Sequence, residues 1–232
     1  MDKKILFLHK CPKELMDMSE DVQTINMKLP EPTLRRLPWY LAYLKLLKAK
    51  GEEYVSSTQI SKEINVDASQ IAKDLSFINI SGKTRVGYEV NTLVDVLEDF
   101  LGFTRTHTAF ILGAGSLGAA LLHDNGLEQY GLRVAAAFDV DPQKVGTVIN
   151  GIPVYHLDEL EAIRSAMDVK IGILTVPVDK AQQVADTMIA YGICAIWNFT
   201  PFRIKVPQEI VVQNTSIYAH LAVMFNRLTF HD

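Results

Sequence analysis

A glycine-rich turn between a predicted strand and a predicted helix limits the folds open to this chain of 232 residues more than any other feature. The apolar run 108–112 is typical of a strand buried on both faces, and the residues after Gly118 are typical of a helix. The turn reads GAGSLG, which has the GxGxxG spacing. Gly113 permits a tight turn, Gly115 lets the backbone approach a pyrophosphate, and Gly118 allows the helix to pack closely on the strand. The N–H groups at the start of the helix then face the negative charge of the phosphates.

The glycine turn alone is weak evidence, but a second strand and its terminal acid strengthen it. Residues 133–138 predict a second buried strand, which ends at Asp139, 26 residues after Gly113. A carboxylate at this place can accept hydrogen bonds from ribose hydroxyls and repels a 2′-phosphate. The pattern therefore favours NAD(H) over NADP(H). The alternative role for Asp139 is a cap on the turn that follows it.

Strands and helices continue to alternate along the second half of the chain. We expect a helix at 158–166 and a second helix capped by Asp179, strands at 171–177 and 193–198, and a further strand near 210–212. This alternation predicts an α/β fold with a Rossmann-like, doubly wound parallel sheet over residues 91–214. Ligands of such sheets lie beyond the carboxyl ends of the strands. The expected cofactor-binding residues are Gly113, Ala114, Gly115, Ser116, Leu117, Gly118, Asp139, Thr175, Val176, Pro177, Asn198, Phe199, Thr200 and Pro201.

The first half of the chain predicts a small helical module over residues 30–90. Apolar residues spaced three or four apart in 33–50 predict an amphipathic helix, which we expect to begin near Leu37 or to bend at Pro38. Ser56 with Gln59 forms a capping box for a second helix, and Asp67 caps a third. Two short helices joined by a tight turn after a longer helix form a helix-turn-helix.

Glycines around Lys83 and Arg85 predict a β-hairpin tip that displays cations, as in the wing of a winged helix. The polar face of the third helix suits base edges in the major groove. A small helical domain that binds another protein explains the pattern about equally well. The expected DNA-binding residues are Ser57, Ser69, Gln70, Lys73, Ser76, Lys83 and Arg85.

Charge and composition restrict where partners can bind. The net charge is −4, but residues 29–90 carry +2 and residues 91–232 carry −6, so any contact with nucleic acid is expected in the first half. Apolar runs are too short for a membrane span or a signal peptide, which predicts a cytoplasmic protein. Neither Cys11 nor Cys194 has a spacing typical of a zinc site, so we expect no metal.

The two ends of the chain carry different patterns. Residues 1–29 lack a sustained period and predict a poorly ordered arm. Residues 215–232 predict a C-terminal helix with one apolar stripe, formed by Ile217, Leu221, Met224, Phe225 and Leu228. The stripe either docks on its own domain or packs against another subunit as a dimerisation helix.

Two other functions fit parts of this pattern. An NAD-dependent dehydrogenase with an accessory helical domain would need a proton-transfer set, and none of the six histidines has a neighbour in such a spacing. We therefore expect no catalytic residues. A module that binds coenzyme A or another nucleotide would carry a similar glycine turn.

Taken together, these segments resemble the Rex family of bacterial redox-sensing transcriptional repressors over roughly residues 30–230. The resemblance implies a homodimer with exchanged C-terminal helices, a winged helix and a Rossmann domain. It also implies that the apo or NAD+ form binds an inverted-repeat operator, that NADH releases it, and that the target genes serve fermentation and respiration. The segments that carry the resemblance are 36–40, 55–57, 73–76, 86–88, 113–118, 138–146, 151–155, 174–177 and 198–201.

The chain departs from the family pattern at positions that concern switching and base recognition. Ala72 stands where the recognition helix usually has arginine. In some members the arginine matching Arg36 takes part in an interdomain switch with residues matching Asp124 and Ser216. Here the Asp124 carboxylate could pair with Arg36, whereas Ser216 carries no charge.

Overall fold

The computed structural model describes residues 29–229, so the arm predicted at 1–29 lies outside the described residues except for Leu29. The described chain forms two compact units, a helical unit up to Arg105 and an α/β unit from Thr106 onward. Between residues 29 and 229 no helix is both long and apolar enough to cross a membrane.

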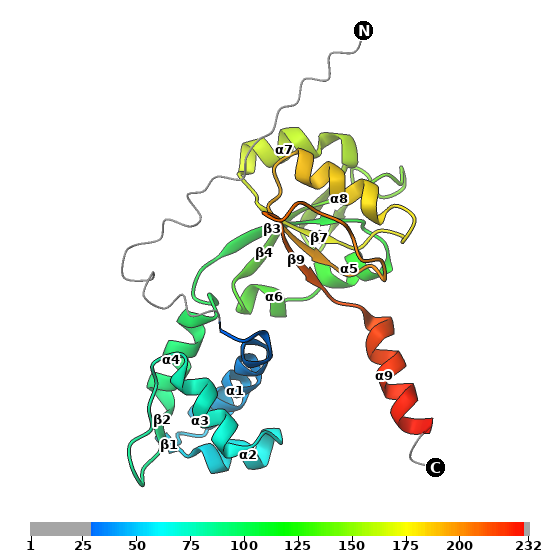
Figure 1. Ribbon diagram of the computed structural model, residues 1–232. Helices are drawn as coiled ribbons and strands as arrows, with labels where there is room; N and C mark the ends of the chain where they lie inside the picture. Colours follow the sequence, from blue (N-terminus) through cyan, green and yellow to red (C-terminus); the bar gives the residue numbers. More distant parts are fainter. Residues whose placement is uncertain (1–28, 230–232) are drawn as a thin grey trace. The chain divides into compact units, whose positions relative to one another are not determined.

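Within residues 29–105 the helical unit has helices α1 to α4 and a two-stranded sheet (Figure 1). Helix α1 is continuous through Pro38 and begins at Glu31, so the expectation of a start near Leu37 is wrong. Pro30 precedes the helix and Pro32 lies in its first turn, where a missing N–H costs nothing. The elements are α1 (Glu31–Ala49), β1 (Tyr54–Val55), α2 (Ser57–Ile64), α3 (Ala68–Ser76), β2 (Tyr88–Glu89) and α4 (Val90–Phe100).

Both predicted helix caps are present. Gln59 N donates to Ser56 Oγ at 3.1 Å, and Ser56 N donates to Gln59 Oε1 at 2.8 Å, which completes the capping box of α2. Asp67 Oδ1 accepts from the backbone N–H groups of Ser69 and Gln70 and so starts α3. These contacts fix the short helices at the residues where the sequence places them.

Helix α4 packs in the helical unit, whereas the boundary expected at residue 90 assigned it to the nucleotide-binding half. Leu93 and Leu97 are at most 1% exposed and lie in the same core as Leu41 and Leu44 of α1. The boundary between the units therefore falls after Arg105. The apolar stripe of α4 reaches this core because β2 leads directly into the helix.

The segment between α3 and α4 forms the predicted hairpin tip. Lys83 N donates to Gly87 O at 2.8 Å, and Gly87 N donates to Lys83 O at 2.9 Å. Gly87 has φ +100°, and a Cβ there would collide with the carbonyl of Val55, so this position requires glycine. Arg85 occupies the tip with φ +65°, a left-handed conformation that is unfavourable for a non-glycine residue.

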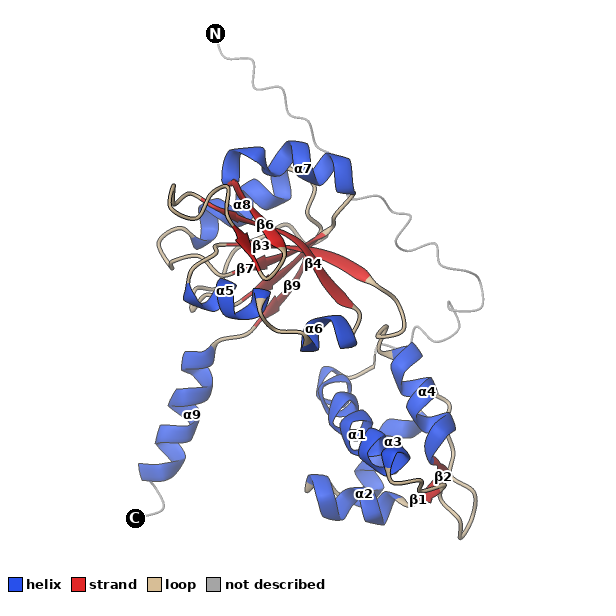
Figure 2. Ribbon diagram, turned by 180° about the vertical axis from the view of Figure 1, so that it is seen from behind, coloured by secondary structure: helices blue, strands red, loops and turns tan. Residues whose placement is uncertain are grey.

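The α/β unit is built on a seven-stranded sheet in the order β5-β6-β4-β3-β7-β8-β9. All neighbours pair in parallel except β5 and β6, which form an antiparallel edge hairpin. Helices α7 and α8 cover one face and α5 lies on the opposite face (Figure 2). The elements are β3 (His107–Leu112), α5 (Ser116–Leu122), α6 (Gly126–Gln129), β4 (Leu132–Asp139), β5 (Val148–Ile149), β6 (Ile152–His156), the 3₁₀ helix η3 (Leu157–Glu159), α7 (Leu160–Met167), β7 (Ile171–Leu174), α8 (Ala181–Ala190), β8 (Ala195–Asn198), β9 (Val211–Asn214) and α9 (Ile217–Thr229).

Two details of this unit differ from the sequence analysis. The β5–β6 hairpin was not predicted, although its turn is Asn150-Gly151, with φ +48° and +78°, the geometry that this pair favours. Helix α8 begins at Ala181 after Lys180, so Asp179 is not its cap. The strand expected near 210–212 is present as β9.

Helix α9 leaves its apolar stripe uncovered by the rest of the described chain. Leu221 is 36% exposed, and the other four stripe residues are between 48% and 63% exposed. The helix leads away from the sheet after β9 (Figure 1). Of the two expectations for this helix, docking on its own domain is therefore not what the structure has.

Candidate functional site

A cavity of about 550 Å³ lies at the carboxyl ends of the central strands. In the sheet, β4 lies on one side of β3 and β7 lies on the other, so the strand order reverses at β3. Open α/β sheets bind their ligands at such a reversal. Six predicted cofactor-binding residues line the cavity: Gly113, Gly115, Asp139, Thr175, Val176 and Pro177. Lining residues that the sequence analysis missed are Leu112, Phe138, Val140, Lys144, Leu157, Lys180, Gln183, Val184 and Thr187.

The three glycines of the turn each meet a different constraint. Gly113 has φ +102°, and a Cβ there would lie 3.0 Å from the backbone of Thr175. A Cβ on Gly118 would overlap the carbonyl oxygen of Gly113, so helix and strand approach closely only because no side chain is present. A Cβ on Gly115 would meet nothing within 4 Å, which leaves this backbone open for a ligand to approach.

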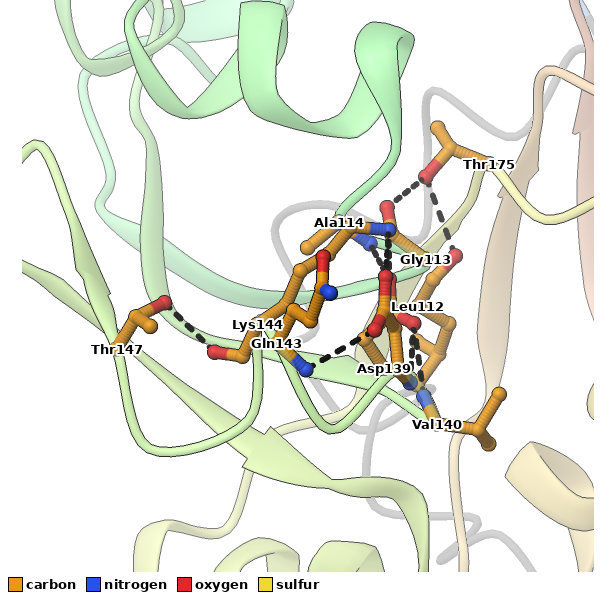
Figure 3. Close-up of polar contacts among 10 residues, drawn as sticks. Leu112, Gly113, Ala114, Asp139, Val140, Gln143, Lys144, Thr147 and Thr175 are labelled. Atoms are coloured by element: carbon orange, nitrogen blue, oxygen red, sulfur yellow. Dashed lines mark hydrogen bonds and ion pairs between the residues drawn. The ribbon is translucent and has the colours of Figure 1, made fainter.

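Thr175, at the end of β7, holds the glycine turn in place (Figure 3). Its Oγ1 lies 2.7 Å from the carbonyl oxygen of Gly113 and 3.1 Å from that of Leu112. This contact joins two segments that are 62 residues apart in the chain. It holds the end of β7 against the glycine turn that follows β3.

Asp139 combines the two roles that the sequence left open (Figure 3). Its Oδ1 accepts from the N–H groups of Val140 and Asp141 at 2.8 and 2.9 Å, as a cap of the following turn does. Its Oδ2 accepts from Ala114 N in the glycine turn at 2.8 Å and faces Lys144 Nζ at 3.4 Å. Burial alone would raise the pKa of Asp139, but these N–H groups and the Lys144 charge hold it below its usual value, so the group is a carboxylate.

The other predicted cofactor-binding residues do not line the cavity. Ala114 and residues 116–118 form the turn and the first turn of α5. The buried Asn198 side chain donates to Phe202 O and to Asn214 Oδ1 and accepts from Thr200, so it holds the loop after β8 together. Phe199 packs on Trp197 with ring centroids 4.6 Å apart. Pro201 belongs to the same loop and is exposed.

A buried carboxylate that the sequence analysis did not identify as functional organises the helical unit. Asp74 of α3 is fully buried. Arg36 donates to it from Nε at 2.7 Å and from Nη2 at 2.8 Å, and Tyr40 Oη donates at 2.6 Å. Thr33 Oγ1 at 3.0 Å and Gln70 Nε2 at 2.8 Å complete the set. Burial would raise the pKa of Asp74, but these donors lower it to about 2, so the ion pair with Arg36 persists at neutral pH.

This network changes what Gln70 and Arg36 can do. The Gln70 amide points at Asp74 and not outward, so this residue is less available to bases than predicted. The partner of Arg36 within the helical unit is Asp74, whereas Asp124 accepts from Gly126 N at 2.8 Å. Within the helical unit, Arg36 therefore joins α1 to α3 through Asp74.

The remaining predicted DNA-binding residues are displayed at the surface. Ser69, Lys73 and Ser76 are exposed on α3, and Ser57 is half-buried at the start of α2. Lys83 and Arg85 are exposed at the hairpin tip, where the Lys83 ammonium lies 5.7 Å from the centre of the Tyr54 ring. None of the three cations forms an ion pair with another residue in the described range 29–229. Within the same range, no group of three or more His, Cys, Asp or Glu residues could hold a metal ion.

Comparison with known proteins assigns both units. Residues 104–202 match the family model described as CoA binding domain, and residues 28–76 match the family model described as putative DNA-binding protein N-terminus. The redox-sensing transcriptional repressor Rex of Bacteroides fragilis is 65% identical over 218 residues, which cover 94% of this chain and 99% of that protein. The chain belongs to the Rex family of redox-sensing transcriptional repressors.

Solved structures with the same architecture extend this result. A crystal structure of RSP in complex with β-NAD+ and operator DNA matches with a TM-score of 0.83 and 34% sequence identity. The match covers 87% of this chain and 93% of the RSP chain. A structure of RSP in complex with β-NADH has a TM-score of 0.80 and 34% identity, over 88% of this chain and 96% of that one. Rex proteins are repressors, so the prediction that this chain is not an enzyme is confirmed and the dehydrogenase alternative is excluded. The predicted fold class is confirmed as well.

Proposed function

We propose that this chain binds operator DNA in its apo or NAD+ state and is released by NADH. It would thereby adjust genes of fermentation and respiration to the NADH/NAD+ ratio in the cytoplasm. The observation that most supports this proposal is the fold shared with RSP, which was crystallised with NAD+ and operator DNA and also with NADH. A glycine turn, a carboxylate at the end of β4 and a cavity beside them also support it.

The dinucleotide would place its pyrophosphate on the backbone N–H groups of residues 113–118, at the start of α5. The adenosine ribose would lie against Asp139, whose neighbouring side chains Val140 and Lys144 also line the cavity. The nicotinamide would extend past Thr175 and Pro177 toward the loop 198–201. In this arrangement one loop shapes the far end of the site. This loop consists of Asn198, Phe199, Thr200 and Pro201.

Operator DNA would be bound by the helical unit, for which we propose residues 30–105. Helix α3 would enter the major groove with Ser69, Lys73 and Ser76 on its exposed face. The cations Lys83 and Arg85 at the hairpin tip would contact phosphates or the minor groove. Ser57 at the start of α2 would contact the DNA backbone.

We infer a homodimer in which α9 packs against the second subunit. The uncovered apolar stripe on α9 supports this inference, because a helix with such a stripe is stable in water only when another surface covers it. A two-fold dimer would match an inverted-repeat operator whose half-sites are about 34–36 Å apart or a multiple of this distance.

Coupling between cofactor and DNA requires that NADH prefers a dimer geometry unsuited to the operator. If NADH weakens operator binding a hundredfold, its preference for that geometry is about 2.7 kcal/mol. Reduction removes the positive charge of the nicotinamide ring, so an apolar surround near Pro177 and Phe199 would favour the reduced form by its lower desolvation cost.

Fluorescence anisotropy of a labelled inverted-repeat duplex tests the proposal. Titrations with the apo protein, with NAD+ and with NADH are run at one fixed salt concentration, because DNA affinity depends strongly on salt. We expect tight binding without cofactor and with NAD+, and a large loss of affinity with NADH. Equal affinity over a wide range of NADH concentrations would exclude the proposed switch.

A further inference from the structure

The ribose end of the cavity contains a lysine between two carboxylates. Lys144 Nζ lies 3.4 Å from Asp139 Oδ2 and 3.4 Å from Asp141 Oδ2, and its side chain is 36% exposed. Charge-assisted hydrogen bonds at their strongest are about 2.7–2.9 Å long, so the ammonium is shared between two partners and is not locked onto either. Lys144 also lines the cavity, which places its charge beside any bound ligand.

The hydrogen bonds of Asp139 determine where a ribose hydroxyl can bind. A carboxylate offers about four acceptor positions. Three of them are already used by the N–H groups of Ala114, Val140 and Asp141. The remaining position on Oδ2 is the one that faces Lys144. A ribose hydroxyl that donates to Asp139 therefore meets the ammonium of Lys144 directly, and this ammonium can in turn donate to the hydroxyl oxygen.

The charges around this position also determine how strongly the cavity repels a 2′-phosphate. The two carboxylates and the ammonium sum to a charge of −1, whereas the carboxylates alone would sum to −2. A phosphate monoester carries about −1.5 to −2 at pH 7, so it is repelled in both cases but less when the lysine is present. The acid that follows the strand is thus not the only determinant of cofactor choice.

We propose that Lys144 is a specificity-determining residue that moderates the preference of this cavity for NADH over NADPH. This inference rests on the proposed function, because it assumes that the adenosine ribose lies beside Asp139. Removal of the lysine charge should sharpen the preference for NADH, and removal of the Asp141 charge should weaken it. Replacement by arginine keeps the charge and should leave the preference close to that of the parent protein.

The test is a pair of titrations of the full-length protein with NADH and with NADPH, followed by the fluorescence of the reduced nicotinamide. For Lys144→Gln we expect the ratio of the NADPH and NADH dissociation constants to rise by about tenfold, since one unit charge is removed at contact distance. For Asp141→Asn we expect the ratio to fall by a similar factor, which brings NADPH binding into range if the parent protein binds it too weakly to measure. Lys144→Arg should restore the parent ratio.

Lys170→Gln is the matched control, because it removes the same charge from a partly buried lysine of the same unit that pairs with Asp168 and does not line the cavity. Its ratio should equal that of the parent. The differences at Lys144 should shrink as salt is raised, because the group is partly exposed. If both Lys144→Gln and Asp141→Asn still bind NADH with the ratio of the parent, the role proposed for Lys144 is overturned and the proposed function is not. Absence of NADH binding by the parent protein would instead overturn the proposed function.

Discussion

Replacement of Asp74 by alanine should destabilise the helical unit severely while the α/β unit still binds NADH. The substitution removes the acceptor of five hydrogen bonds, two from Arg36 and one each from Thr33, Tyr40 and Gln70. It also leaves the guanidinium of Arg36, whose side chain is only 20% exposed, without its counter-ion. Loss of one partner of a buried ion pair costs about 3–5 kcal/mol, which is a large part of the roughly 5–15 kcal/mol that stabilises a typical domain.

Urea unfolding can measure this loss in the helical unit separately. The two tryptophans lie in different units, Trp39 in α1 and Trp197 in β8, so a Trp197→Phe background leaves Trp39 as the reporter for the helical unit. In that background Asp74→Ala should lower the free energy of unfolding by about 3–5 kcal/mol. An NADH titration of the same variant should remain close to that of the parent.

Asp95→Ala is the control from the same unit. Asp95 faces Lys48 at 3.4 Å with a side chain that is 69% exposed, so its loss should cost less than about 0.5 kcal/mol. If Asp74→Ala lowers the stability of the helical unit by no more than Asp95→Ala does, the buried carboxylate does not stabilise this unit. The same conclusion follows if the loss of stability appears in the α/β unit instead.

Three further predictions follow from the same contacts. The pKa of Asp74 is about 2 in the folded unit, against a usual value of 3.8 for an aspartate. Its stabilising effect should therefore be complete above about pH 4 and lost as the pH falls toward 2. Acid unfolding followed by circular dichroism should show this pH dependence in the parent protein and not in Asp74→Asn. Arg85→Gly should raise the free energy of unfolding by about 0.5–1 kcal/mol, because glycine adopts the left-handed backbone conformation without strain. The same substitution should weaken operator binding and lower the salt dependence of binding. Unchanged affinity in anisotropy would exclude a phosphate contact by Arg85. Phe225→Glu places a charge on the stripe of α9 and should convert the proposed dimer to monomers in sedimentation velocity, whereas the same substitution at the exposed Thr229 should not.

Features set by residues close together in the chain could be predicted from the sequence. The caps at Ser56 and Asp67 each depend on residues two or three positions away, and the glycine turn depends on six consecutive residues. The β5–β6 hairpin also has a local signal in Asn150-Gly151, although it was not predicted. Such signals are readable because the backbone conformation is decided within one turn.

Features set by distant residues could not be predicted in the same way. The partners of Asp74 in α1 lie 34 to 41 residues away, so no short pattern marks this carboxylate as buried. No local pattern shows which core buries α4, and the boundary expected at residue 90 separated this helix from the core in which it packs. The position of Lys144 between Asp139 and Asp141 depends on the path of a turn, and the loop at 198–201 was placed beside the cofactor from strand order alone. Strand order locates the edge of the sheet where ligands bind but not the individual side chains that reach them.

The coupling between cofactor and operator is tested most directly by measuring NADH affinity in the presence and absence of DNA. Calorimetric titration of NADH into the free protein and into the protein saturated with an inverted-repeat duplex gives the two dissociation constants at one salt concentration. We expect DNA to weaken NADH binding by the same factor by which NADH weakens DNA binding, since linkage between two sites is reciprocal. Equal NADH affinity in the two titrations would show that the two sites are not coupled.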